Sequence, residues 1–143
     1  MIKLKKNIFE FIKSILIPLG GGIIISLISN MTSYNLIIPA IVFPIVWTVL
    51  YTLMGISSYL VKRDGGNLKI YYLQLIVNFL WPLIYFNWDK KFLALIVIII
   101  LIGLVIHMIS YFKEYNKLAA KFQIPYLIWL TVALFLNFIS LFK

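Results

Sequence analysis

Residues 39–61 read PAIVFPIVWTVLYTLMGISSYLV and carry no charge over 23 residues. A helix needs roughly 20 apolar residues to cross a bilayer, so this segment is long enough to span one. Within it, aromatic, glycine and hydroxyl residues recur every three or four positions and therefore share one helical face: Phe43, Trp47, Tyr51, Gly55 and Ser58. Such a stripe indicates either one wall of a ligand pocket or ordinary packing in a helical core.

The composition extends the membrane prediction to the whole chain. Of its 143 residues, 64% are hydrophobic and only 12% are charged, whereas soluble domains are about 45–50% apolar and about 25% charged. Four charge-poor runs cover residues 14–61, 70–88, 92–112 and 122–142, and the first is long enough for two spans. We therefore predict an all-α membrane protein, a single domain over residues 1–143 that folds as a five-transmembrane-helix bundle. The expected helices cover residues 12–30, 39–61, 70–88, 92–112 and 122–142, with loops at 31–38 and 113–121.

The basic residues indicate how the bundle is oriented. Ten of the 13 fall before or at the start of the first predicted helix or in the loops after the second and fourth, and three fall on the other side. The positive-inside rule then places the N-terminus in the cytoplasm and the C-terminus outside. A net charge of +9 distributed in this way favours anionic membrane lipid as a partner and does not indicate nucleic acid.

Two further predicted helices carry polar and aromatic stripes. Asn78 and Trp81 share a face of the third helix, and Trp129 and Ala133 share a face of the fifth. If these faces converge with that of Trp47, they form a flat-walled apolar pocket with few polar groups, which suits a planar hydrophobic ligand. The alternative is ordinary core packing.

Several reactive groups are missing from the predicted spans. The chain has no cysteine, which excludes thiolate catalysis, disulfides and cysteine-based metal sites. The spans hold no paired carboxylates, so ion-coupled transport and hydrolysis lack their usual side chains. His107, the one histidine, is interpreted as a neutral side chain that bonds a neighbour or reaches the interface, with a haem-ligand role as the alternative. We expect no metal and no resident cofactor, and tryptophan-based photochemistry stays open.

Small residues in the first predicted helix indicate a close helix contact. Gly22 and Ser26 form a small-xxx-small pair. The pair is compatible with packing inside the bundle or with a dimer seam.

Three segments together resemble one known family. FPIVWTVLYTLMGISSY at 43–59, LQLIVNFLWPLIYF at 73–86 and IPYLIWLTVALFLN at 124–137 are similar in order and spacing to the TspO/MBR family, the tryptophan-rich sensory proteins related to the mitochondrial translocator protein, or peripheral benzodiazepine receptor. The resemblance implies a five-helix bundle, commonly a homodimer, that binds porphyrins such as protoporphyrin IX. It also implies an integral membrane location, here expected in a bacterial cell membrane.

The resemblance also suggests site residues. The expected ligand-binding set is Pro39, Phe43, Trp47, Tyr51, Asn78, Trp81, Trp129 and Ala133. The expected function is binding of a tetrapyrrole or similar molecule as a sensor, carrier or scavenger. One alternative is light-dependent porphyrin degradation, for which Trp47 and Trp129 are the catalytic candidates, and another is a structural membrane partner with an occluded core.

Two departures from the family pattern are visible. The segment 31–38 is shorter than the family's loop over the ligand, and Phe138 stands where the sterol motif needs a tyrosine. Sterol binding is therefore not expected.

Overall fold

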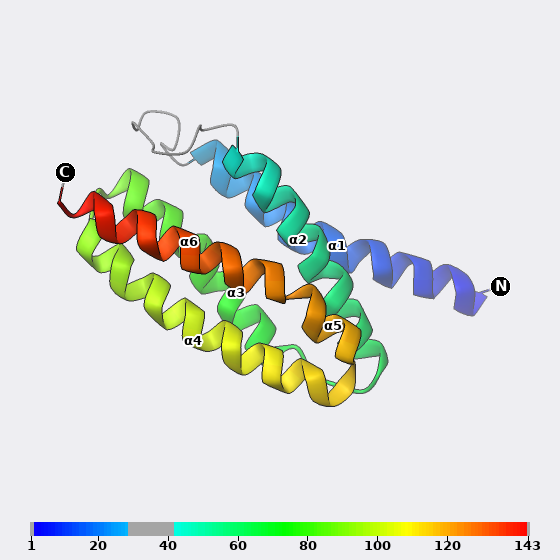
Figure 1. The fold of residues 1–143 in the computed structure, drawn as a ribbon. Helices are drawn as coiled ribbons and strands as arrows, with labels where there is room; N and C mark the ends of the chain where they lie inside the picture. Colours follow the sequence, from blue (N-terminus) through cyan, green and yellow to red (C-terminus); the bar gives the residue numbers. More distant parts are fainter. Residues whose placement is uncertain (1, 29–41, 143) are drawn as a thin grey trace.

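The computed structural model describes residues 2–28 and 42–142, with the side chains of residues 7–28 and 44–142 (Figure 1). Its elements are α1 (Ile2–Ile28), α2 (Val42–Arg63), α3 (Lys69–Pro82), a π-helical segment η2 (Leu83–Asn87), α4 (Lys91–Tyr115), α5 (Lys117–Phe122) and α6 (Ile124–Ser140). Five helical stretches in the described part are long and apolar enough to cross a membrane, with α3 and η2 forming one and α5 and α6 another. The predicted all-α architecture of five membrane-spanning helices is confirmed.

Helix boundaries differ from the prediction at two places. The first helix begins at Ile2 and not near residue 12, so the basic segment ahead of the predicted helix is helical as well. The predicted loop 113–121 is also mostly helix, since α4 continues to Tyr115 and α5 follows after one extended residue, Asn116. The Asn116 side chain accepts a hydrogen bond from the Ala119 amide and so caps α5. The predicted loop 31–38 and Pro39 lie outside the described residues.

Prolines explain two local features. Pro44 lies in the first turn of α2, where a missing amide donor costs little. At the end of α3, Pro82 lacks an amide donor, and the backbone bonds beyond it widen: the Trp88 amide donates to the Leu83 carbonyl, five residues back, at 2.9 Å. This widened segment completes the third span.

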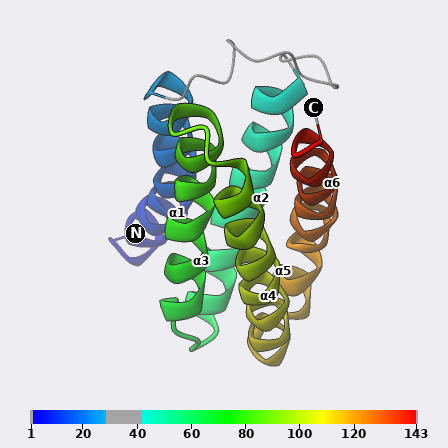
Figure 2. The ribbon, with the colours of Figure 1, turned by 90° about the vertical axis from the view of Figure 1, so that its left-hand side faces the viewer.

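Three helix pairings organise the bundle. α1 packs along α2, while α4 packs against both α3 and α6, and α5 lies between α4 and α2. Figure 2 shows that α3 and α6 run in the same direction, and Figure 1 shows the N-terminal half of α1 extending beyond the bundle. The α1–α2 pair therefore lies beside a group formed by α3, α4 and α6.

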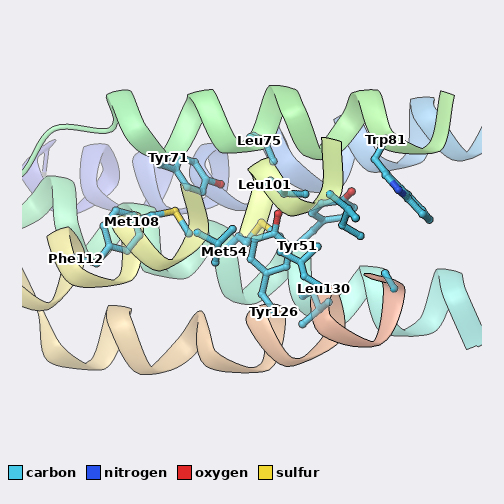
Figure 3. Close-up of a cluster of buried hydrophobic side chains, with 14 of the residues drawn as sticks. Tyr51, Met54, Tyr71, Leu75, Trp81, Leu101, Met108, Phe112, Tyr126 and Leu130 are labelled. Carbon is cyan, nitrogen blue, oxygen red and sulfur yellow. The ribbon is translucent and has the colours of Figure 1, made fainter. Parts of the chain in front are cut away.

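The core is filled by side chains from four helices. Figure 3 shows Met54 of α2, Tyr71 of α3, Met108 of α4 and Tyr126 of α6 pointing into the same interior, and all four are fully or almost fully buried. The outer surface is also apolar, with residues such as Leu27, Ile99 and Phe135 exposed. An apolar exterior around a packed core is what a bilayer requires.

Candidate functional site

Trp47 and Tyr51 form an aromatic wall on α2. They lie one helical turn apart, and their rings stack with centroids 5.3 Å apart and an interplanar angle of 24°. Trp47 also meets two rings of α6 edge-on, Tyr126 at 6.2 Å and Trp129 at 6.3 Å. Offset-stacked and edge-on geometries are the favourable ones for aromatic pairs. The cluster therefore ties α2 to α6 and fixes the orientation of the Trp47 indole.

A cleft of about 150 Å³ opens beside this wall, between α1 and α2. Its α2 side includes Trp47, Thr48 and Tyr51, and its α1 side includes Gly22 and Ser26. The Thr48 and Ser26 hydroxyls donate to carbonyls of their own helices, at 2.6 Å to Pro44 and 2.8 Å to Ile23. Each hydroxyl oxygen then keeps acceptor capacity toward the cleft.

Gly22 allows α1 to lie directly against the Tyr51 ring. A Cβ atom placed on Gly22 would clash with the edge of that ring. The shape of the cleft therefore depends on the absence of a side chain at this position. Of the two interpretations of the Gly22–Ser26 pair, the structure shows packing inside the bundle for Gly22.

A chain of hydrogen bonds runs from Tyr51 into the core. The Tyr51 hydroxyl donates to Asn78 Oδ1 at 2.6 Å, and Asn78 Nδ2 donates to the Tyr126 hydroxyl at 2.9 Å. The Tyr126 hydroxyl in turn donates to Gln74 Oε1 at 2.8 Å. All four side chains are buried, and Figure 3 places Tyr51 and Tyr126 together at the centre of the bundle. The Asn78 amide thus finds its partners inside the protein.

Trp81 belongs to a separate polar group. Its indole Nε1 donates to Asn137 Oδ1 at 2.9 Å, and Asn137 Nδ2 donates to the Lys91 carbonyl at 2.9 Å. The indole also stacks on Tyr85, with centroids 5.1 Å apart. These contacts join α3, α6 and the start of α4, and Figure 3 shows Trp81 away from the Tyr51–Tyr126 pair.

Comparison with known proteins identifies the family to which this arrangement belongs. The model of the TspO/MBR family matches residues 14–141, nearly the whole chain. The chain belongs to the TspO/MBR family. It is therefore an integral membrane protein with five apolar helices.

Named relatives come from distant organisms. The chain is 35% identical over 103 residues to the tryptophan-rich sensory protein of Cereibacter sphaeroides, a match that covers 70% of this chain and 65% of that protein. It is 35% identical over 97 residues to translocator protein 2 of Mus musculus, covering 62% of this chain and 60% of that protein. It is 33% identical over 101 residues to the translocator protein of Homo sapiens, covering 65% of this chain and 60% of that protein. The matches thus span less than two thirds of these relatives' own lengths.

The predicted site residues of this TspO/MBR chain fall into three groups. Trp47 and Tyr51 line the cleft. Asn78 accepts a hydrogen bond from Tyr51, and Trp129 packs edge-on against Trp47. Ala133 is buried on α6, and Trp81 lies in the Asn137 group. Pro39 and the Phe43 side chain lie outside the described residues. A ligand-binding role for each residue stays a prediction.

Sequence reasoning missed two members of the hydrogen-bond chain and one wall of the cleft. Gln74 lies one turn before Asn78, so its spacing placed it on the same face. Tyr126 precedes Trp129 on the stripe of the fifth predicted helix in the same way. Gly22 and Ser26 were recognised as a close-contact pair, but a contact pair does not reveal that the contact borders a cleft.

His107 lies away from the cleft, exposed on α4. Among the described residues there is no group of three or more His, Cys, Asp or Glu side chains that could hold a metal ion.

Proposed function

We propose that this TspO/MBR protein binds planar hydrophobic molecules of the tetrapyrrole class within the membrane, as a sensor, carrier or scavenger. The observation that carries the proposal is the stacked Trp47–Tyr51 pair, which lines a cleft between α1 and α2. A flat aromatic ligand gains apolar burial and ring contacts on such a wall. The names of the relatives, a sensory protein and translocator proteins, agree with a sensing or carrying role.

The size of the cleft determines how much of such a ligand it holds. A cavity of about 150 Å³ accommodates one benzene-sized group, and the cleft has about that volume. A tetrapyrrole has four pyrrole rings, so the cleft in this form holds one ring. The remaining rings would then extend between α1 and the surrounding lipid.

The polar groups of the cleft favour a ligand that donates hydrogen bonds. Because the Thr48 and Ser26 hydroxyls already donate to backbone carbonyls, they face the cleft as acceptors. A pyrrole N–H or a protonated carboxyl group on the ligand supplies the matching donor. The Asn78 amide is held by Tyr51 and Tyr126, so it acts mainly by positioning the Tyr51 ring.

Tryptophan fluorescence in lipid nanodiscs tests the proposal. Titration with protoporphyrin IX should give saturable quenching, and Trp47→Phe should weaken binding while removing a large part of the quenching. Trp88→Phe is the matched control, because Trp88 is 56% exposed at the end of its span. Trp88→Phe should leave the affinity unchanged. Absence of saturable quenching, or equal affinities for the two variants, would refute the proposed function.

Light-dependent breakdown of the bound porphyrin is the second candidate function. The contact between Trp47 and Trp129 favours it. The Trp47 indole lines the cleft, and the centroid of the Trp129 ring lies 6.3 Å from that of the Trp47 ring. The light-excited porphyrin would take one electron from Trp47, and Trp129 would return one electron to Trp47, which leaves the porphyrin reduced and Trp129 oxidised. The test is illumination of the porphyrin complex: the porphyrin absorbance band should decay with formation of a distinct product, more slowly in Trp129→Phe and not at all in darkness.

The orientation and the assembly are also proposed. The N-terminus is assigned to the cytoplasm and the C-terminus to the outside, because Lys62, Arg63 and Lys117 share the basic end of the bundle with other lysines. The chain has no cysteine, so labelling of single cysteines at Asn67 and Asn87 by an impermeant reagent reports each side directly.

The proposed homodimer rests on the family resemblance, and light scattering of the purified protein tests it.

A further inference from the structure

The two glutamines of the chain lie in its interior with unused hydrogen-bonding groups. Gln74 on α3 and Gln123, which links α5 to α6, are both 0% exposed. Gln74 Nε2 and both polar atoms of the Gln123 amide have no hydrogen-bond partner among the described residues. The hydroxyl of Tyr71, which is 1% exposed, makes no hydrogen bond within this part of the chain either, although the Ser58 side chain lies near it. A buried polar group without a partner costs about 1–3 kcal/mol. Three such residues in one chain therefore call for a binding partner.

Helix register places the three residues together. α3 and α6 run in the same direction, and they are joined by the 2.8 Å bond from Tyr126 to Gln74. Tyr71 precedes Gln74 by three residues, and Gln123 precedes Tyr126 by three. Both therefore lie about one turn closer to the same end of the bundle. We call Tyr71, Gln74 and Gln123 the glutamine cluster.

Gln123 directly precedes α6 and is in line with its inward face. The buried residues that follow it are Tyr126, Leu130, Ala133 and Asn137, at alternating spacings of three and four. Two of them, Tyr126 and Asn137, bond directly to α3 residues. The face that carries Gln123 is thus the face that α6 turns toward α3.

The chemistry of the glutamine cluster identifies its ligand. The unused groups are neutral amide N–H donors, one amide oxygen and one phenol, so they offer both donors and acceptors and no charge. An ion would leave either the donors or the acceptors unmatched, and an apolar molecule would match neither. Water matches both, and globular proteins hold on the order of one buried water per 27 residues. We propose that the glutamine cluster is a binding site for ordered water inside the membrane-spanning bundle.

This water site would be continuous with the hydrogen-bond chain of the core. From Gln74 the chain passes through Tyr126 and Asn78 to Tyr51, which lines the cleft. Two of the linking groups are amides, which do not readily pass a proton from one side to the other. The chain therefore fixes side-chain orientation and does not serve as a proton path.

Solid-state NMR of the whole protein in lipid bilayers tests the proposal. Because the chain has only two glutamines, side-chain ¹⁵N labelling of glutamine gives signals from this cluster alone, and labelling of the tryptophan indoles supplies the references. Gln123→Leu assigns the two glutamine signals. Polarisation transferred from water should reach both glutamine amides as rapidly as it reaches the exposed Trp88 indole. The slow reference is the indole of Trp81, which is 7% exposed and donates to Asn137 inside the protein.

The result that overturns the proposal is equally definite. If the transfer to either glutamine is as slow as that to Trp81, the cluster holds no shared water. The measurement needs no porphyrin, so its outcome is independent of the ligand-binding tests. A fast transfer to both amides that persists in Trp47→Phe supports a water site separate from the cleft.

Discussion

The Tyr51 hydroxyl donates a hydrogen bond of 2.6 Å to Asn78 Oδ1, across 27 residues of sequence and between two membrane-spanning helices. This bond connects the wall of the cleft to the core of the bundle. Both side chains are buried, so the bond has no competition from bulk water. The position of the Tyr51 ring therefore depends on α3 as well as on α2.

Removal of the Tyr51 hydroxyl should destabilise the bundle. Tyr51→Phe leaves Asn78 Oδ1 buried without its donor, and we expect a loss of about 1–3 kcal/mol in the free energy of unfolding. Titration with SDS in mixed micelles measures this loss. Tyr59→Phe makes the same chemical change at a hydroxyl that bonds no described residue, and it should be close to neutral. Equal effects of the two variants would contradict the assigned role of the bond.

A side chain at Gly22 should both destabilise the protein and reduce the cleft. In Gly22→Ala the new methyl group meets the Tyr51 ring, which the bond to Asn78 holds in place. Overpacking costs about 1–3 kcal/mol, and alanine recovers up to about 1 kcal/mol through its helix propensity. We expect a net loss of about 1–2 kcal/mol and weaker porphyrin quenching. Gly20→Ala is the control, because nothing lies within 4 Å of its new Cβ atom.

Gly55→Ala should be more severe than Gly22→Ala. Its Cβ atom would lie 2.5 Å from the Ile15 Cα atom and 2.7 Å from the Ser14 carbonyl oxygen, and a helix backbone cannot rotate away as a ring can. We expect a loss of about 3 kcal/mol, at the upper end of overpacking effects. SDS titration again measures it, with Gly103→Ala as the control on an open face of α4. If Gly55→Ala were as stable as Gly103→Ala, the close contact between α1 and α2 would be disproved.

Asp64 should make stability depend on pH at the basic end of the bundle. The hydrogen bond from Asn116 Nδ2 at 2.8 Å, followed by that from Arg63 Nε at 3.1 Å, lowers the pKa of the Asp64 carboxyl group. A lowered folded-state pKa means that the stabilisation is complete above the unfolded value of about 3.9 and is lost as pH falls through the folded value. Thermal unfolding between pH 6 and pH 3 should therefore show a decline in Tm that is smaller in Asp64→Asn. An identical decline in both proteins would rule out this contribution.

Span number and the aromatic wall could be predicted because they depend on single-helix patterns. Charge-free length fixed the five spans, and a spacing of four placed Trp47 and Tyr51 on one face. Helix α5 was not predicted, because its charged residues Lys117 and Lys121 are typical of a loop between membrane spans. Ala119 and Ala120, which lie between them, are nevertheless buried. In a helix this short, two inward alanines and an asparagine cap are sufficient.

The pairing of helices could not be predicted in the same way. Periodicity shows which face of a helix is inward, but not which neighbouring face it meets. The bonds from Tyr126 to Gln74 and from Trp81 to Asn137 depend on α3 and α6 running in the same direction on either side of the core, with α4 packed against both. For the same reason the sequence identified Gly22 as a contact residue without identifying Tyr51 as its partner.

The close contacts along α1 and α2 are unevenly placed. The backbone at Ile15 lies against Gly55, whereas the cleft lies nearer the C-terminal end of α1, where it is bordered by Gly22 and Ser26. One half of the helix pair is thus clamped and the other half is open. To admit a bulkier ligand, the C-terminal turns of α1 would rotate outward about the Gly55 contact while its N-terminal half stayed in place. The α1–α2 pair would then act as a hinge, with the contact at Gly55 as its pivot.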